Sequence, residues 1–204
     1  MGELTDNTNK TLLSYQGRPI ISYIVEALSK HTNKIKIVVG YKKTQIIKHL
    51  RLTFPDIEFQ FIDQVKLMGT GSAISLLKDE SDYYFITMGD MIFHQEDLDN
   101  FIQNFKNKNG NYIMSKTVSN PEKYGVFELD GTKLINLEEK PEKPKSNSVN
   151  LGSYIFDKSI FKYIKQTNPT SNNEIYITDS IKLSLDDGNL FKIYNLKNDF
   201  SDFW

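Results

Sequence analysis

The residues best placed for chemistry begin with an aspartate that follows a predicted strand. The apolar run Tyr83–Met88 is typical of a strand, and Gly89-Asp90 comes directly after it. In open α/β sheets, ligands bind beyond the carboxyl ends of the strands, so Asp90 is well placed for a metal ion or a phosphate. Mg2+ prefers carboxylate and phosphate oxygens, and one or two protein carboxylates beside a triphosphate suffice. The alternative is an aspartate that only caps a turn.

A second candidate is the glycine-rich turn Gly69-Thr70-Gly71, which opens a predicted helix over Gly69–Leu77. Glycine allows another backbone or a ligand to approach closely, and a helix N-terminus favours an anionic or polar ligand. The alternative is an ordinary turn between a strand and a helix.

A third candidate comprises three short segments in the second half of the chain: Tyr124-Gly125-Val126, Glu139-Lys140-Pro141 and Asn150-Leu151-Gly152. A lysine serves as a point charge for phosphate, and a proline fixes the chain beyond it. Taken alone, Glu138, Glu139 and Lys140 could equally form a solvated run of charges.

These segments, in this order, resemble the sugar-1-phosphate nucleotidyltransferases. The N-terminal run adds to the resemblance, with Leu4-Thr5, Lys10, Leu12-Leu13 and Gly17-Arg18-Pro19 in the order that this family shows. The resemblance covers nearly the whole chain. It implies an α/β fold, a Rossmann-like sheet of the GT-A type, mixed in direction and flanked by helices.

The resemblance also implies that residues 1–204 form a single nucleotidyltransferase domain that is incomplete at both ends. The family's first central strand and its Gly-x-Gly-x-Arg loop would precede Met1, so we expect that strand to be missing. A second magnesium aspartate would stand two residues beyond Trp204. Asp199 and Asp202 lie near that tryptophan, but at the wrong offset.

The family's site residues can be carried over one by one. Asp90 matches the metal-binding aspartate, so Mg2+ is the implied cofactor. Lys10 matches a lysine that contacts the nucleoside triphosphate, and Lys10, Lys140 and Asp90 are the implied catalytic set. The implied nucleotide-binding residues are Lys10, Gln64, Gly69 and Thr70, and the implied sugar phosphate-binding residues are Gly125, Glu139, Lys140 and Asn150.

Two departures from the family pattern affect the expected site. Asn9 and Thr11 stand where the family has prolines on both sides of its lysine, and we expect this change to loosen the loop. The segment from Glu174 to Asp179 resembles a family helix entry. Thr178 and Asp179 are common helix-start residues, so we interpret them as structural.

The function that the resemblance implies is transfer of a nucleotidyl group from a nucleoside triphosphate to a sugar 1-phosphate. UTP or dTTP is favoured because Gln64 suits a pyrimidine edge. The alternatives are a phosphocholine cytidylyltransferase and a non-catalytic remnant or regulatory subunit of the same fold. A glycosyltransferase is disfavoured, because Asp90-Met91-Ile92 lacks the second aspartate of an Asp-x-Asp motif.

Apolar periodicity alternates between short strands and amphipathic helices, which predicts strands joined by helical crossovers. Pro19 is expected at the first position of a helix over Pro19–His31. From about Gly110, short runs separated by turns predict mixed or antiparallel pairing. The remaining expected elements are strands at Ile35–Val39, Ile57–Ile62, Tyr112–Ser115, Tyr124–Leu129, Leu134–Glu138, Val149–Phe156 and Leu190–Asn195, and helices at Lys43–Leu52, Leu98–Phe105, Ile160–Lys165 and Ile177–Leu185.

Composition limits the classes of partner. A net charge of −1 over 204 residues gives no basic field for a nucleic acid polymer, so the expected ligands are small. The chain has no cysteine for disulfides or Cys-bound zinc. No apolar run approaches the roughly 20 residues of a membrane span, and no segment resembles a signal peptide. We therefore expect a cytoplasmic protein without a membrane partner, for which a homo-oligomeric state is an option.

Overall fold

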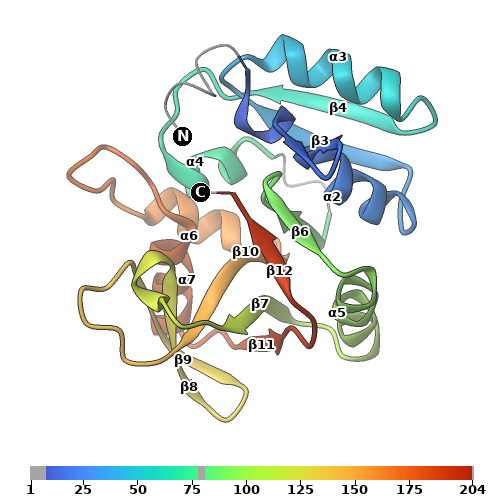
Figure 1. Ribbon diagram of the computed structural model, residues 1–204. Helices are drawn as coiled ribbons and strands as arrows, with labels where there is room; N and C mark the ends of the chain where they lie inside the picture. Colours follow the sequence, from blue (N-terminus) through green and yellow to red (C-terminus); the bar gives the residue numbers. More distant parts are fainter. Residues whose placement is uncertain (1–7, 78–80, 204) are drawn as a thin grey trace. The chain divides into compact units, whose positions relative to one another are not determined.

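The computed structural model describes residues 8–77 and 81–203 (Figure 1). Contacts within the chain divide these residues into two compact units. The first unit comprises residues 8–67, 88–98 and 198–203, and the second comprises residues 68–87 and 99–197. The expectation of one domain over residues 1–204 stays a prediction.

The first unit is built around two parallel strands and the helices that cover them (Figure 1). Strand β3 pairs with β4 in register from Lys34 opposite Glu58 to Val39 opposite Asp63. Apolar side chains of α2, β3 and α3 form one core cluster, which places Leu50 and Val25 among the least exposed residues. The elements are η1 (Lys10–Leu12), β1 (Ser14–Tyr15), β2 (Arg18–Pro19), α2 (Ile20–Ser29), β3 (Lys34–Val39), α3 (Lys43–Thr53) and β4 (Glu58–Asp63).

A second strand pair of the first unit joins segments that are distant in the sequence. β6 (Met91–Phe93) pairs antiparallel with β12 (Phe200–Asp202), so that Met91 lies opposite Asp202. The buried Asp97 side chain accepts a hydrogen bond from the Asn198 backbone, 2.9 Å away. This contact fixes the chain just before β12 begins. Periodicity predicted neither strand, because each has only three residues.

The second unit contains a six-stranded sheet in the order β5-β10-β7-β11-β9-β8. Only β7 and β11 pair in parallel, and the other neighbours are antiparallel. Strand β10 is flanked on both sides, and its eight central residues are all buried. The strands are β5 (Tyr83–Thr87), β7 (Asn111–Thr117), β8 (Gly125–Asp130), β9 (Lys133–Glu139), β10 (Ser148–Asp157) and β11 (Phe191–Asn195).

Helices α4, α6 and α7 of the second unit contact one another, and α7 also packs on β9. The helices and the short 3-10 turn of this part of the chain are α4 (Gly69–Ser75), η2 (Pro121–Lys123), α6 (Ile160–Gln166) and α7 (Ile177–Asp186), and α5 (Gln95–Asn107) has residues in both units. The predicted mixed or antiparallel pairing after Gly110 is therefore confirmed. The same holds for the α/β class with its mixed sheet.

One predicted helix start is wrong. Pro19 has an extended conformation, with ψ 136°, and pairs with Ser14 in a short hairpin. The helix begins at Ile20, whose N–H donates to the Leu13 carbonyl at 3.1 Å. The hairpin thus uses the proline as the last extended residue before the helix.

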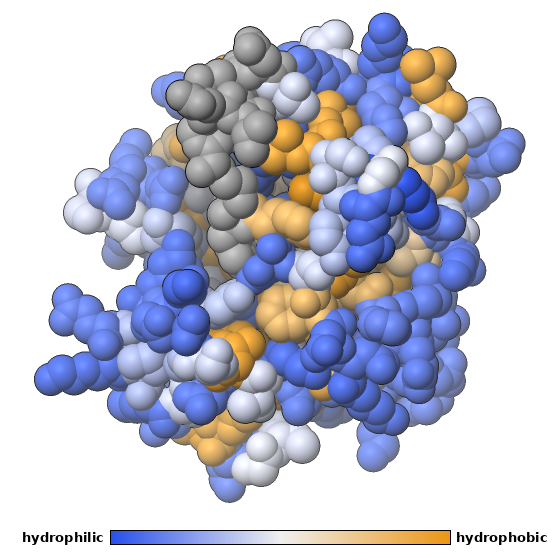
Figure 2. Space-filling view, viewed as in Figure 1, coloured by the Kyte–Doolittle hydropathy of each residue, from blue (hydrophilic) through white to orange (hydrophobic). Residues whose placement is uncertain are grey.

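Hydrophilic residues cover most of the face seen in Figure 2, with apolar residues showing between them. The described residues contain no helix that is both long and apolar enough to cross a membrane.

Candidate active site

The predicted triphosphate lysine lies next to the predicted metal aspartate. Lys10 Nζ is 2.6 Å from Asp90 Oδ2. The Asp90 side chain is only 9% exposed, whereas that of Lys10 is 42% exposed. Strand β5 ends at Thr87, earlier than the predicted Met88, so Asp90 stands directly before β6 and not one residue past β5. The first unit therefore contains a largely buried carboxylate with a cation beside it.

The Lys10 loop is held by hydrogen bonds from Asn9. The Asn9 Oδ1 accepts from the Thr11 backbone N–H at 3.0 Å and from the Thr11 hydroxyl at 2.9 Å. The Asn9 Nδ2 donates to the Tyr41 carbonyl at 2.7 Å. The prediction that Asn9 and Thr11 loosen this loop is wrong, because their side chains supply bonds that cap the turn and tie it to the next loop.

Asp90 could hold Mg2+ as the single ligand that the protein supplies. Over residues 8–77 and 81–203, no three histidine or acidic side chains gather into a metal-binding group. One buried carboxylate is nevertheless enough where phosphate oxygens and water complete the coordination. In this structure the Lys10 ammonium lies 2.6 Å from one oxygen of this carboxylate.

Gln64 follows β4 immediately, at the carboxyl ends of the two parallel strands. Its backbone N–H donates to the Val39 carbonyl at 2.7 Å, which joins the loops after β3 and β4. A Cβ on Gly40 would lie 2.8 Å from a Leu67 methyl group, which is the far end of an exposed side chain and could move aside. Val65 and Leu67, on the same loop, are 84% and 65% exposed.

In the second unit, the Gly69-Thr70-Gly71 turn packs against the chain's own segment at Ile175. A Cβ on Gly69 would come within 2.6 Å of the Ile175 carbonyl oxygen, and one on Gly71 within 3.0 Å of the same atom. Gly71 N–H donates to that oxygen at 2.8 Å, and the Thr70 hydroxyl accepts from Ile177 N–H at 3.1 Å. Backbone packing by itself therefore requires both glycines.

Gly125 and Glu139 face each other across the β8–β9 pair. A Cβ on Gly125 would lie 3.2 Å from Glu139 Oε2 and 3.3 Å from the Thr178 methyl carbon. Burial raises the pKa of the Glu139 carboxyl, although the Lys140 charge and the Thr178 hydroxyl act in the opposite direction. Burial likewise raises the pKa of Asp179. The second unit thus holds a partly buried carboxylate without a full counter-charge.

The Thr178 hydroxyl is a polar group that the sequence did not single out. It is buried, and no described residue forms a hydrogen bond of standard geometry with it, although it lies close enough to Glu139 to lower the pKa of that carboxyl. The Thr178 hydroxyl is therefore part of the surroundings of the Glu139 carboxylate. The helix-entry motif was the signal, but its ordinary role as a helix start concealed this position.

Lys140 and Asn150 differ in exposure and in the hydrogen bonds that they form. Lys140 is exposed and has a positive φ of 44°, and its N–H donates to the Tyr124 carbonyl at 2.9 Å. Asn150 is buried, its Oδ1 accepts from Gly152 N–H at 3.0 Å, and its Nδ2 donates to the Tyr154 hydroxyl at 2.8 Å. Asn150 therefore shapes the irregular centre of β10, while Lys140 is an exposed cation.

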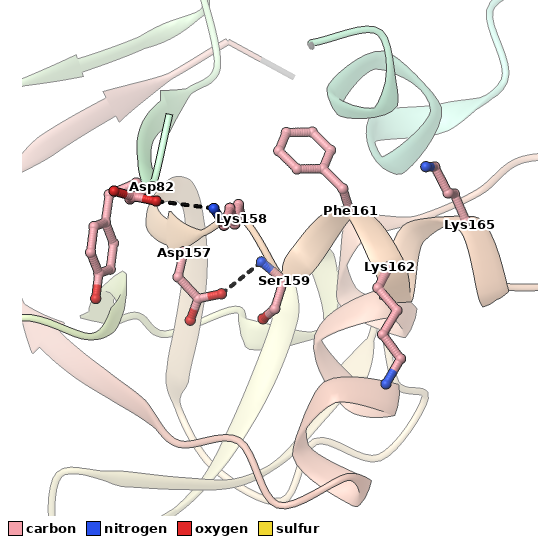
Figure 3. Close-up of a pocket in the computed structure, with 8 residues that line it drawn as sticks. Asp82, Asp157, Lys158, Ser159, Phe161, Lys162 and Lys165 are labelled. Carbon is pink, nitrogen blue, oxygen red and sulfur yellow. Dashed lines mark hydrogen bonds and ion pairs between the residues drawn. The ribbon is translucent and has the colours of Figure 1, made fainter. Parts of the chain in front are cut away.

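A separate hollow of about 740 Å³ lies in the second unit (Figure 3). None of the residues predicted from the sequence lines it. Two lysines that line it are already in ion pairs: Lys158 pairs with Asp82 at 3.1 Å, and Lys162 pairs with Asp187 at 3.1 Å. Its lining is Asp82, Tyr83, Asp157, Lys158, Ser159, Phe161, Lys162 and Lys165.

Comparison with known proteins identifies a family and several relatives. The chain matches the nucleotidyl transferase family over residues 2–204. A bifunctional protein GlmU from Methanocaldococcus jannaschii is 38% identical over 181 residues, which cover 88% of this chain and 42% of that protein. The low-salt glycan biosynthesis nucleotidyltransferase Agl11 from Haloferax volcanii is 29% identical over 192 residues, covering 91% of this chain and 54% of that protein. The chain spans about half the length of these curated relatives.

Two solved structures share the fold. A protein assigned as a glucose-1-phosphate thymidylyltransferase from Bacillus anthracis has a TM-score of 0.88 and 28% identity, covering 99% of this chain and 84% of that one. An apo UDP-glucose pyrophosphorylase has a TM-score of 0.86 and 22% identity, covering 99% and 88%.

The arrangement of strands and helices therefore places the chain among the mixed α/β, Rossmann-like proteins. Within that class, the match over residues 2–204 and the 38% identity to a curated relative show that the chain belongs to the nucleotidyl transferase family.

Proposed function

We propose that this chain transfers a nucleotidyl group from UTP or dTTP to a sugar 1-phosphate, forming a nucleoside diphosphate sugar and pyrophosphate. The observation that carries the proposal is the buried Asp90 carboxylate with the Lys10 ammonium 2.6 Å away. Both residues match the family's motif positions, and their charges suit a metal ion and a triphosphate. Family membership supports this class of reaction.

In the proposed reaction, an oxygen of the sugar phosphate attacks the α-phosphorus of the nucleoside triphosphate. A new oxygen–phosphorus bond forms while the bond from the α-phosphorus to the bridging oxygen breaks. The electron pair of that bond leaves with pyrophosphate. Because no covalent bond to the protein is required, the protein contributes positioning and stabilisation of negative charge.

Residues of the first unit would hold the nucleoside triphosphate. The Lys10 ammonium would leave Asp90 and pair with the phosphates. Gln64 would hydrogen-bond to the base. Asp90 would hold Mg2+, which when bound neutralises charge on the phosphates. Gln64 carries both a donor and an acceptor and so suits the edge of a pyrimidine. The thymidylyltransferase assignment of the Bacillus anthracis relative supports a pyrimidine nucleotide.

Residues of the second unit would hold the sugar 1-phosphate. Glu139 would accept hydrogen bonds from sugar hydroxyls, and the unpaired Thr178 hydroxyl beside it would make another. A carboxylate that is partly buried beside Gly125 gains when a ligand's hydroxyls replace lost water. The exposed Lys140 would neutralise the sugar phosphate.

The expected partners remain small molecules, with a cytoplasmic location and possible homo-oligomerisation as predictions from the sequence. A phosphocholine cytidylyltransferase would not use Glu139 in this way, because its acceptor has no sugar hydroxyls.

The test is release of pyrophosphate by the full chain from UTP, dTTP or CTP, with glucose 1-phosphate or choline phosphate as acceptor and with or without Mg2+. Chromatography would identify the nucleotide sugar. Magnesium-dependent release that Asp90→Asn abolishes supports the proposal. Binding of UTP without any pyrophosphate release would instead favour the non-catalytic alternative, and choline phosphate as the better acceptor would favour the cytidylyltransferase.

A further inference from the structure

We propose that Asn9 is a positioning residue for Lys10, and that Tyr41 and Gln45 are its anchors. This inference rests on the proposed function and assigns a role to a residue that the family pattern leaves as a substitution. Asn9 precedes Lys10 directly and is tied at three atoms. Four hydrogen bonds at these atoms fix the start of the loop from which the Lys10 ammonium reaches Asp90.

The first part of the anchor acts within the loop. Asn9 Oδ1 accepts from the Thr11 backbone and hydroxyl, which caps the 3-10 turn Lys10–Leu12. A cap of this kind satisfies a backbone donor that the turn leaves open. It fixes the direction in which the Lys10 side chain leaves the backbone.

The second part connects the loop to the ends of the parallel strands. Asn9 Nδ2 donates to the Tyr41 carbonyl at 2.7 Å, and Asn9 N–H donates to Gln45 Oε1 at 3.2 Å. Tyr41 directly follows Gly40 after β3, and Gln45 lies in the first turn of α3. The Lys10 loop is therefore fastened to the same strand ends that carry Gln64.

The backbone of Asn9 explains why an asparagine can replace a proline here. Its φ is −63° and its ψ is 139°. Proline is locked near φ −65°, so a proline would hold the same backbone conformation by its ring. Asn9 is held in that conformation by four hydrogen bonds, which involve three of its atoms. A proline ring and a hydrogen-bonded asparagine would thus hold the backbone before the lysine in the same conformation.

The experiment measures two properties of the full chain: the affinity for Mg2+·UTP by calorimetry, and the rate at which Lys10 is acetylated by dilute acetic anhydride, followed by mass spectrometry. Lys66, which is exposed, provides the internal reference for the acetylation rate. We expect Asn9→Ala to weaken Mg2+·UTP binding about five- to tenfold, because two or three modest hydrogen bonds are lost. The same variant should acetylate Lys10 several-fold faster.

Rescue distinguishes positioning from folding. Asn9→Pro should restore both values to between those of Asn9→Ala and the parent chain, because it keeps φ but forms no bond to Tyr41 or Gln45. Thr32→Ala is the matched control, since it removes a comparable side-chain bond to the Lys34 backbone elsewhere in the first unit. It should change neither property.

A double-mutant cycle with Lys10→Met completes the test. If Asn9 acts through Lys10, Asn9→Ala adds no further loss of affinity in the Lys10→Met background. An equal loss in both backgrounds would overturn the inference, as would unchanged affinity and acetylation in Asn9→Ala. If the parent chain binds no Mg2+·UTP, the proposed function fails, and the acetylation rates alone still decide whether Asn9 holds Lys10.

Discussion

Each of the two units contains an acidic side chain that is largely removed from water. The two side chains differ in whether a nearby cation offsets their charge. Asp90, in the first unit, has a lysine 2.6 Å away. Glu139, in the second unit, has its pKa raised by burial that the Lys140 charge does not offset. A compensated carboxylate is ready to exchange one cation for another. An uncompensated one favours ligands that donate hydrogen bonds to it.

This contrast matches the two proposed ligands. A metal triphosphate brings positive charge to Asp90 and negative charge to Lys10. Each residue therefore gains a new partner of opposite charge when the ion pair between them breaks. A sugar brings hydroxyl groups, which replace the water that Glu139 has lost. The comparison therefore predicts that variants in the two units will affect different kinetic parameters.

The largest effect is expected from Asp90→Asn. Loss of one group that stabilises a transferring phosphoryl group lowers the rate by about 10²- to 10³-fold. The measurement is pyrophosphate release at saturating UTP and glucose 1-phosphate, over a range of Mg2+ concentrations. Asp63→Asn is the control, because it removes the exposed Lys43–Asp63 ion pair in the same unit. Comparable losses in both variants would show that Asp90 has no special role.

The next largest effect concerns the Gly69-Thr70-Gly71 turn. Gly69→Ala should lower the free energy of unfolding by about 2–4 kcal/mol, since it combines a positive φ with a clash against Ile175. Gly188→Ala is matched in φ, 87° against 86°, but has open space around the new methyl group. It should cost only about 1–2 kcal/mol. Equal losses in urea unfolding would mean that the Ile175 contact contributes nothing.

A smaller effect sharpens the contrast directly. Glu139→Gln should raise the KM for the sugar 1-phosphate about tenfold and leave the KM for UTP within about twofold, because a hydrogen bond to a charged group is worth about 1.5–3 kcal/mol. Steady-state kinetics with each substrate varied in turn provides the measurement. A rise in the KM for UTP instead would remove the assignment of the two ligands to different units.

The smallest effect is on stability against pH. Because the folded pKa of Glu139 lies above its ordinary value of 4.5, the folded state retains a proton that the unfolded state has lost, and stability falls as pH rises from about that value. Glu139→Gln should flatten this fall in urea unfolding between about pH 4 and pH 7. Glu128, whose pKa is lowered by its bond to Lys145, has the opposite sign. Glu128→Gln should therefore lose stability at the higher pH, and matching slopes in the two variants would refute the contrast.

Much of the secondary structure was predictable, because long elements carry strong periodic patterns. The helix observed at Lys43–Thr53 and the strand at Ser148–Asp157 each lie within two residues of their predicted bounds. The strands β6 and β12 were not predictable, since three residues show no period and their partners are distant in the sequence. Pro19 was placed in the helix because its φ suits both a helix start and an extended residue.

The candidate site was predictable in residue type and less so in geometry. Asp90 and Lys10 were both expected from motifs, but only the fold brings their charged atoms to 2.6 Å. Asn9 was expected to loosen the loop, because the sequence does not show that Tyr41 and Gln45 offer it partners. Thr178 was interpreted as a helix start, and its unpaired hydroxyl became evident only from its burial.

The sequence by itself determined the α/β class, the family and the order of the chemical groups along the chain, because these depend on local periodicity and on short motifs. The tertiary structure alone decided which groups share an environment. It gave Asp90 a counter-ion and gave Glu139 an incompletely compensated charge, and it required Gly69 and Gly71 to accommodate the backbone at Ile175. The physical reason is that charge interaction, desolvation and steric exclusion depend on distance in space, which the spacing of residues along a chain does not specify.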